Sequence, residues 1–243
     1  MWMFNNTDIM KDKLLSAAIL AAGIIVMGLC LKAGMDNFTE KDRKVTVKGL
    51  AEKEVKADKV TWPILSKELG DDLPELYDRI AHKQQTIKHF LLANGISESE
   101  ITVNAPKVID LTAEQYSNND HPYRYNVTLV ITVNSSHVDR VRSLIMRQGE
   151  LLKQGVAIVA ADYDAPQVTY SLKSFKEMKP KMMTEAIENA EQTAQQFAKN
   201  SKSQLNKIVE ADQGQFSIDD RDANTPWIKV VRVVTTVTYS LKN

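Results

Sequence analysis

The sequence predicts an α+β protein, in which an antiparallel sheet is covered by helices in two similar helix–hairpin halves, preceded by one N-terminal transmembrane helix. Three observations support this prediction. An uncharged apolar run occupies residues 14–31, several later segments alternate apolar and polar residues, and others repeat apolar residues every three or four positions. Strands and helices follow one another in the order strands, helix, hairpin, helix, strands, helix, hairpin, which is typical of α+β architecture.

The apolar run LLSAAILAAGIIVMGLCL at 14–31 follows two basic residues, Lys11 and Lys13. A helix needs roughly 20 apolar residues to cross the hydrocarbon core of a bilayer. The stretches 28–30 and 31–33 both match the small-x-small pattern of signal peptidase sites poorly, and Leu29 before Cys30 disfavours lipidation. We therefore expect an uncleaved signal anchor, with a short tail at 1–13, a polar spacer at 32–43 and a domain at 44–243.

The first part of that domain has clear periodicities. Residues 45–57 alternate with a period of two, as a strand with one buried face does, and a second strand is expected near 60–69. Asp71 or Asp72 can cap the next helix, which should end at Asn94-Gly95. The segment 125–133 alternates again, with Leu129 on its inward face.

The second part resembles the first. A helix at about 176–202 and a hairpin at 208–239 follow a connecting helix at 136–148, for which Ser136 and Asp139 suggest a capping box. An offset of 107 aligns apolar residues of the two parts, which suggests a duplication with halves 44–135 and 136–243. The aligned pairs are Ile80 with Ile187, Phe90 with Phe197 and Ile101 with Ile208. We expect the second helix to pack through Met183, Ile187, Ala190, Ala194 and Phe197.

Composition argues against several classes of function. The 31 basic and 31 acidic residues balance, so the chain lacks the basic surface that nucleic-acid binding requires. The single cysteine, Cys30, lies within the apolar run, which leaves the domain no thiol for a disulfide, a redox centre or a sulfur-ligated metal.

No motif specifies a reaction, and we predict no catalytic, cofactor-binding or metal-binding residues. His82 and His89 lie two helical turns apart, about 10 Å, which is too far for one metal ion. His121 and His137 are isolated in the sequence. The acidic stretches 118–120 and 219–222 lack the spaced ligands of a calcium loop and are interpreted as solvated hairpin tips.

Two aromatic residues are candidates for an interaction site. Tyr123 and Trp227 each follow a loop proline and precede a strand. They could form a shared binding platform, or they could pack where their strands begin. We name both as candidate interaction residues and keep both interpretations open.

Several short stretches resemble the SIMPL-domain family over residues 44–243. They are Val45-Thr46-Val47-Lys48-Gly49, Ala57-Asp58-Lys59-Val60, Gln154-Gly155-Val156 and the alanine ladder Ala186, Ala190, Ala194 and Ala198. The resemblance implies a bacterial envelope protein with an N-terminal signal or anchor, and some family members resemble ring-forming oligomers. It brings no catalytic residues. The ladder allows close approach to a sheet or helix within the domain, or to a second protomer.

These observations lead to two functional hypotheses. The first is a non-catalytic protein of the bacterial inner membrane, single-pass through 14–31 with its C-terminal domain in the periplasm, which forms homo-oligomers or binds a partner. The second is an envelope hydrolase or small-ligand-binding protein with a site between the two halves. A deep pocket with inward polar side chains would favour the second, and a flat apolar outer patch would favour the first.

Overall fold

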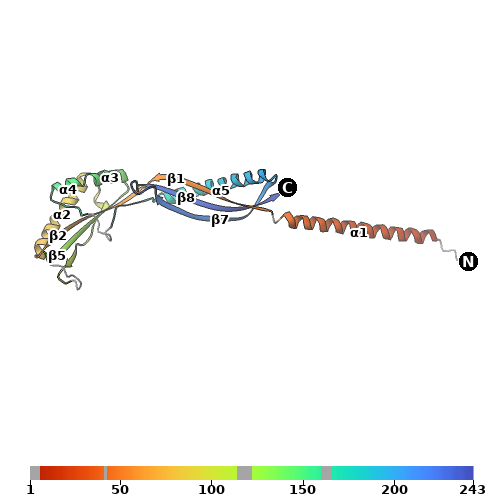
Figure 1. Ribbon diagram of the computed structural model, residues 1–243, viewed down its shortest axis with the longest axis horizontal. Coiled ribbons are helices and arrows are strands. Elements are labelled where there is room, and N and C mark those ends of the chain that lie inside the picture. Colours follow the sequence, from red (N-terminus) through yellow and green to blue (C-terminus); the bar gives the residue numbers. More distant parts are fainter. Residues whose placement is uncertain (1–5, 41–42, 114–121, 160–165, 243) are drawn as a thin grey trace. The chain divides into compact units, whose positions relative to one another are not determined.

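The computed structural model describes residues 6–40, 43–113, 122–159 and 166–242 (Figure 1). Its strands form a three-stranded sheet in the order β1-β8-β7 and a five-stranded sheet in which β3-β5-β2-β6 are neighbours and β4 also pairs with β5. This confirms the predicted α+β class with antiparallel sheets. The elements are α1 Asn6–Glu40, β1 Lys44–Lys56, β2 Lys59–Gly70, α2 Leu73–Ala93, η1 Glu98–Glu100, β3 Ile101–Val103, β4 Lys107–Asp110, β5 Tyr125–Ser135, α3 Val138–Met146, α4 Gly149–Lys153, β6 Thr169–Ser171, α5 Phe175–Asn200, β7 Gln204–Asp220 and β8 Ile228–Lys242.

Helix α1 is longer than the apolar run that predicted it. It extends from Asn6 to Glu40, so most of the expected tail and spacer is helical. Within it, the 23 residues Lys13–Met35 are long and apolar enough to cross a membrane, a length and composition that also suit a signal sequence. At 1.5 Å per residue this stretch spans roughly 35 Å.

The chain divides into two compact units. Unit 1 comprises Met1–Ala51, Lys181–Phe216 and Arg232–Asn243, and unit 2 comprises Glu52–Pro180 and Ser217–Val231. The predicted halves 44–135 and 136–243 do not coincide with these units. The reason is that the first strand of the domain, β1, pairs with the last, β8, which brings both ends of the domain into one sheet.

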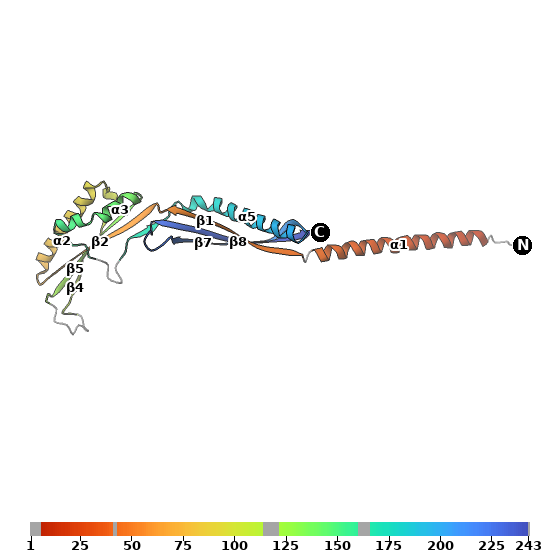
Figure 2. The same cartoon turned by 45° about the horizontal axis from the view of Figure 1, so that its top comes forward.

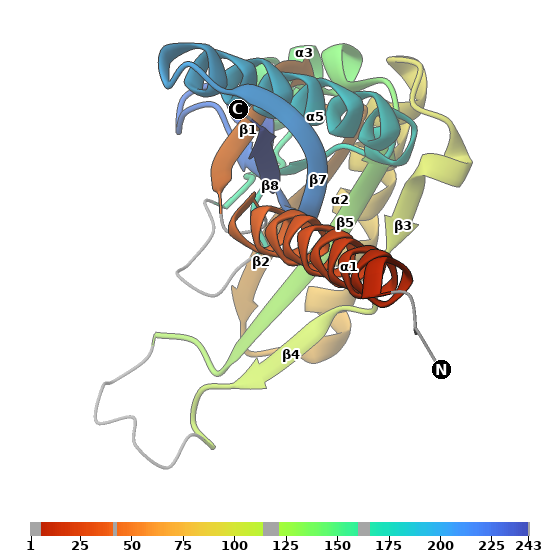
Figure 3. The ribbon, with the colours of Figure 1, turned by 90° about the vertical axis from the view of Figure 1, so that its right-hand side faces the viewer.

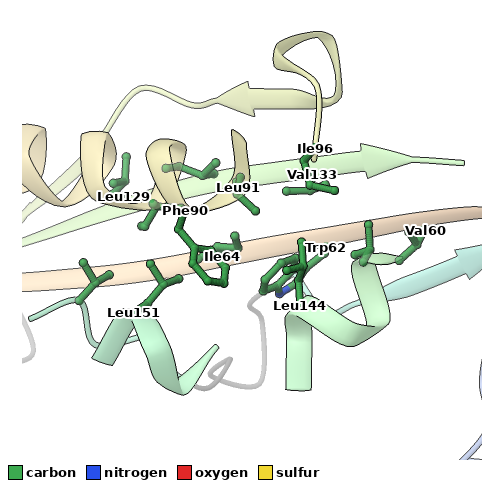
Figure 4. Packing of buried hydrophobic residues seen from close by; sticks show 14 of the residues in the cluster. Val60, Trp62, Ile64, Phe90, Leu91, Ile96, Leu129, Val133, Leu144 and Leu151 are labelled. Carbon is green, nitrogen blue, oxygen red and sulfur yellow. The ribbon is translucent and has the colours of Figure 1, made fainter. Parts of the chain in front are cut away.

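The main hydrophobic core lies in unit 2. Strands β2 and β5 pair antiparallel from Val60–Ser135 to Gly70–Tyr125, and α2 and α3 pack against them. Four of the residues of β5 predicted to face inward are buried, Leu129 among them, whereas Tyr125 and the outward Thr128 are only partly buried. Figure 4 shows side chains from both strands and from the helices meeting in this core.

The helix boundaries in unit 2 test two predictions about caps. Asp72 caps α2 by accepting the Glu75 backbone N–H at 3.1 Å, as the sequence indicated. The capping box predicted at Ser136 is wrong. Helix α3 begins at Val138 with His137 as its N-cap, so Ser136 stands outside the helix, and no side chain caps that end.

In unit 1, α5 lies along one face of the three-stranded sheet (Figures 2 and 3). Its alanine ladder is buried and, with Val47, Val237 and Tyr239, contributes to a second hydrophobic cluster. A Cβ at Gly49 of β1 would lie 1.8 Å from the carbonyl oxygen of Ala186. The ladder therefore packs within the chain, and the backbones of α5 and β1 approach very closely.

The predicted packing face of α5 is partly wrong. Ile187 and Phe197 are exposed, at 40% and 57%, whereas their aligned counterparts Ile80 and Phe90 are buried, at 1% and 4%. The close approach at Gly49 leaves room only for small side chains beside it, so alanines occupy the contact, Met182 is buried one turn before it, and Ile187 and Phe197 are left exposed. The two sheets nevertheless share part of their strand order, since β8 lies between β1 and β7 in one and β5 lies between β2 and β3 in the other.

Candidate functional site

Trp227 packs where strand β8 begins. Its ring lies edge-on to that of Tyr170, with centroids 6.3 Å apart, and the Arg142 guanidinium carbon lies 3.4 Å from its centroid. The Trp227 carbonyl accepts the Ala57 backbone N–H at 2.8 Å. Burial raises the pKa of the Tyr170 hydroxyl. These contacts give Trp227 a packing role close to the start of β2.

Tyr123 lies at the opposite end of β2. It is 45% exposed, and its neighbour Arg124 donates its backbone N–H to the Asp71 carboxylate, just beyond the end of β2 at Gly70. The 12 residues of β2 span roughly 35–40 Å at the rise of an extended strand. Tyr123 and Trp227 therefore do not form one platform.

The histidines and acidic loops show no metal-binding arrangement in the part of the chain that the structure describes. No group of three His, Cys, Asp or Glu side chains there could hold a metal ion. Of the acidic stretch 219–222, Asp219 and Asp220 end strand β7. Beyond it, Asp222 accepts the backbone N–H groups of Asn224 and Thr225, and hydrogen bonds led by that from the Thr225 side chain lower the pKa of its carboxyl. His121 and residues 118–120 lie outside the described residues.

Glu100 joins η1 to the end of β5. Its carboxylate accepts hydrogen bonds from the Ser135 hydroxyl at 2.5 Å and from the Ser97 backbone N–H at 2.9 Å, and His137 Nδ1 lies 3.5 Å away. Burial acts to raise the pKa of the Glu100 carboxyl, but the hydrogen bonds, led by that from Ser135, outweigh it and lower the pKa to about 2. The carboxylate is thus held ionised.

This cluster has the residue types of a nucleophilic triad in the wrong arrangement. In a triad the histidine lies between the nucleophile and the carboxylate, so that it can take the proton. Here Glu100 lies between Ser135 and His137, and the Ser135 hydroxyl accepts only the backbone N–H of His137. We interpret the cluster as a structural tie, which the Ser97-x-x-Glu100 capping box alone hinted at in the sequence.

A groove of about 550 Å³ lies between β1 and α5 in unit 1. Two exposed apolar side chains, Leu50 and Phe197, contribute to it. The Asn189 side-chain amide donates a hydrogen bond to the Leu50 carbonyl oxygen at 2.7 Å. The remaining lining residues are Lys48, Gln192, Thr193, Gln196 and Asn200.

Strand β7 forms the other edge of the same sheet. It is 17 residues long, and nearly all of its side chains are exposed. Ile208 and Val209 are 55% and 49% exposed although they are large and apolar. An edge strand presents backbone N–H and C=O groups on its open side, where another strand can pair with them.

Comparison with models of known protein families identifies the family of this chain. The family model SIMPL, described as a protein of unknown function (DUF541), matches residues 45–239. The chain belongs to the SIMPL family. The matched range of this SIMPL domain begins in β1 and ends in β8, so it includes both sheets, the groove and β7, and it leaves out α1. No curated protein matched the chain.

The structure and the sequence thus point to different parts of the SIMPL domain. The sequence singled out Tyr123 and Trp227, which lie far apart. It missed the pairing of Leu50 and Phe197 in the groove, because one lies on a strand and the other on a helix almost 150 residues later. The signal in the sequence was weak: Phe197 follows Gln195 and Gln196 and stands next to Ala198, the last of the four alanines of the ladder.

Proposed function

We propose that this SIMPL protein is a non-catalytic protein of the bacterial inner membrane, held there by α1 as a retained anchor, with its C-terminal domain in the periplasm. In this proposal it acts by associating with further copies of itself. The observation that carries the proposal is the open edge β7, with two adjacent exposed apolar residues, Ile208 and Val209.

Proteins commonly protect an edge strand by shortening it, by placing charges or proline on it, or by covering it. Strand β7 is long and contains no proline. Charged residues occur on both sides of the Ile208-Val209 pair, at Lys207 and Glu210, but the pair itself is apolar. Such an edge is suited to pairing with another chain.

The apolar helix supplies a second argument. Tethering by α1 would confine copies to one plane and raise their effective concentration, so that a weak lateral contact would be populated. The 23-residue span Lys13–Met35 has the length for such a tether. The groove residues of unit 1 and the inverted order of Ser135, Glu100 and His137 offer no nucleophile with an adjacent base, which supports a non-catalytic role.

Chemical crosslinking of the full chain in native membranes tests this proposal. Amine-reactive crosslinkers of several lengths should give a ladder of homo-oligomers, since lysines such as Lys48 and Lys207 lie on both sheet edges. Only monomer at every length, together with turnover of a substrate that one acidic substitution abolishes, would contradict self-association and favour an enzyme.

A further inference from the structure

Strand β1 is the second open edge of the three-stranded sheet. It lies at the end of the strand order, and the part of the chain that the structure describes places no strand beyond it. At this edge the Leu50 carbonyl oxygen is bonded by the Asn189 side chain of α5 instead of by a neighbouring strand. Each molecule therefore has two edges, β1 and β7, on opposite sides of one sheet.

The side of α5 that faces the β1 edge differs from the rest of its exposed surface. The α5 positions that line the groove carry no charge: they are Asn189, Gln192, Thr193, Gln196, Phe197 and Asn200. The other exposed positions of the same helix segment include Lys181, Glu185, Glu188, Glu191 and Lys199. Loss of charge together with an exposed aromatic residue is typical of the centre of a protein–protein interface.

We propose that the groove between β1 and α5 receives strand β7 of a second copy, so that β7 of one molecule extends the sheet of the next at β1. This inference rests on the proposed self-association and names its two surfaces. Addition of a strand to an open sheet edge is a common mode of recognition, in which backbone hydrogen bonds give affinity and side-chain pockets give specificity.

The apolar residues of the two surfaces match. Ile208 and Val209 are exposed on β7, and Leu50 and Phe197 are exposed in the groove. Adjacent strand residues point to opposite faces, so Val209, which has the alternation of the inward-packed Leu205, shares the α5 face with Phe197, and Ile208 shares the other face with Leu50. Pairing the two edges would bring one apolar pair together on each face, and burial stabilises by roughly 25 cal/mol per Å² of apolar area. The neutral amides of α5 would remain available as hydrogen-bond partners for the incoming strand.

Charge also favours this pairing over β7 with β7. The unit 1 part of β1, residues 44–51, carries Lys44 and Lys48 and no acidic residue. The unit 1 part of β7, residues 204–216, carries Glu210 and Asp212 against the single Lys207. Two β7 strands would repel each other, whereas β7 and β1 attract, and complementary charges of this kind select the partner.

The contact is heterologous, because one copy contributes its β7 edge and the other contributes its β1 edge and groove. Both β1 and β7 run antiparallel to β8: Leu241 bonds Arg43 while Trp227 bonds Ala57, and Thr235 bonds Asp212 while Ile228 bonds Arg221. A copy displaced sideways along the sheet therefore presents β7 parallel to β1. Such a contact leaves one open edge at each end and continues beyond a dimer unless it closes.

Cysteine crosslinking between two tagged populations of the full chain in membranes tests this inference. Both populations carry Cys30→Ala, so that the native thiol does not react. One carries Val209→Cys, on the α5 face of β7, and the other Gln196→Cys, in the groove. The control replaces Gln196→Cys by Gln195→Cys, the same residue type about 100° away around α5 and outside the groove.

We expect a crosslinked product containing both tags with Gln196→Cys, its loss with Gln195→Cys, and no product from Val209→Cys alone. Product from Val209→Cys alone would overturn the inference in favour of β7 pairing with β7. Loss of the mixed product while amine crosslinkers still give oligomers would overturn it and leave the proposed function standing. Only monomer with both reagents would overturn both.

Discussion

Gly49 of β1 lies directly against the carbonyl oxygen of Ala186 in α5, so close that a Cβ at Gly49 would come within 1.8 Å of that oxygen. Real side chains do not tolerate this separation, and the obstacle is backbone, which cannot rotate away. The contact fixes the distance between helix and sheet, and it explains why α5 buries alanines. The groove beside β1 exists because the helix is held at this distance.

Substitution of this glycine should therefore destabilise unit 1. Gly49→Ala forces α5 away from β1 and should lower the free energy of unfolding by about 1–3 kcal/mol, as overpacking of a core does. Urea unfolding of the detergent-solubilised chain, followed by circular dichroism, measures this. Gly149→Ala is the matched control, because a Cβ there meets nothing within 4 Å, and equal losses for the two variants would contradict the close approach.

The two aligned phenylalanines should respond differently to truncation. Phe90→Ala removes a buried side chain from the unit 2 core and should cost about 3–5 kcal/mol. Phe197→Ala removes an exposed side chain and should leave the free energy of unfolding nearly unchanged while it weakens association through the groove. Comparison of unfolding and of crosslinking yield for the two variants separates these effects. A large loss of stability in Phe197→Ala would mean that its side chain is buried.

Strand β5 offers a test of its two faces. Leu129→Ala should cost about 2–5 kcal/mol, because its side chain is fully buried in the unit 2 core. Thr128→Ala, one residue away on the other face, should cost little. Similar losses in both variants, measured by urea unfolding, would refute the assignment of faces.

The Glu100 tie predicts a dependence of stability on pH. Its carboxyl pKa is about 2 in the folded chain against an ordinary value of 4.5, so the carboxylate stabilises the fold above pH 4.5, and this contribution is lost as the pH falls from 4.5 towards 2. Glu100→Gln should cost about 1–3 kcal/mol at pH 7 and flatten the fall below pH 4.5. Glu188→Gln, an exposed carboxyl on α5, is the control. An unchanged pH profile in Glu100→Gln would disprove the tie.

Retention of the anchor is a separate prediction. No good small-x-small cleavage site follows the apolar run, so membrane-extracted protein should still carry the peptides of residues 1–13. Mass spectrometry of the intact protein decides this. A mature N-terminus between residues 30 and 35 would identify the segment as a cleaved signal sequence.

Sequence reasoning succeeded where one face of an element is buried along its whole length. Strand β5 and helix α2 repeat apolar residues with the period of a strand and of a helix, respectively. Asp72 caps α2 through a hydrogen bond to Glu75, only three residues further along the chain. Local patterns of this kind need no knowledge of the tertiary partner.

Sequence reasoning failed where a segment far away in the chain decides which side chains of an element are buried. The face of α5 is chosen by Gly49, more than 130 residues earlier, so the largest apolar residues of the helix were a misleading guide to burial. Tyr123 and Trp227 have similar local sequences but lie at opposite ends of β2. The groove combines Leu50 with Phe197 through the same long-range packing.

The mass of the detergent-solubilised full chain, measured by light scattering across a dilution series, tests the central claim most directly. We compare the natural chain with a variant carrying Ile208→Lys and Val209→Lys, which adds charge to exposed β7 positions without touching the core. The natural chain should have a mass that is a multiple of the 27.3 kDa protomer at the highest concentration, and the variant should be a monomer. A natural chain that stays monomeric in detergent and gives no crosslinks in membranes would contradict self-association, and a variant that assembles as the natural chain does would contradict the role of β7.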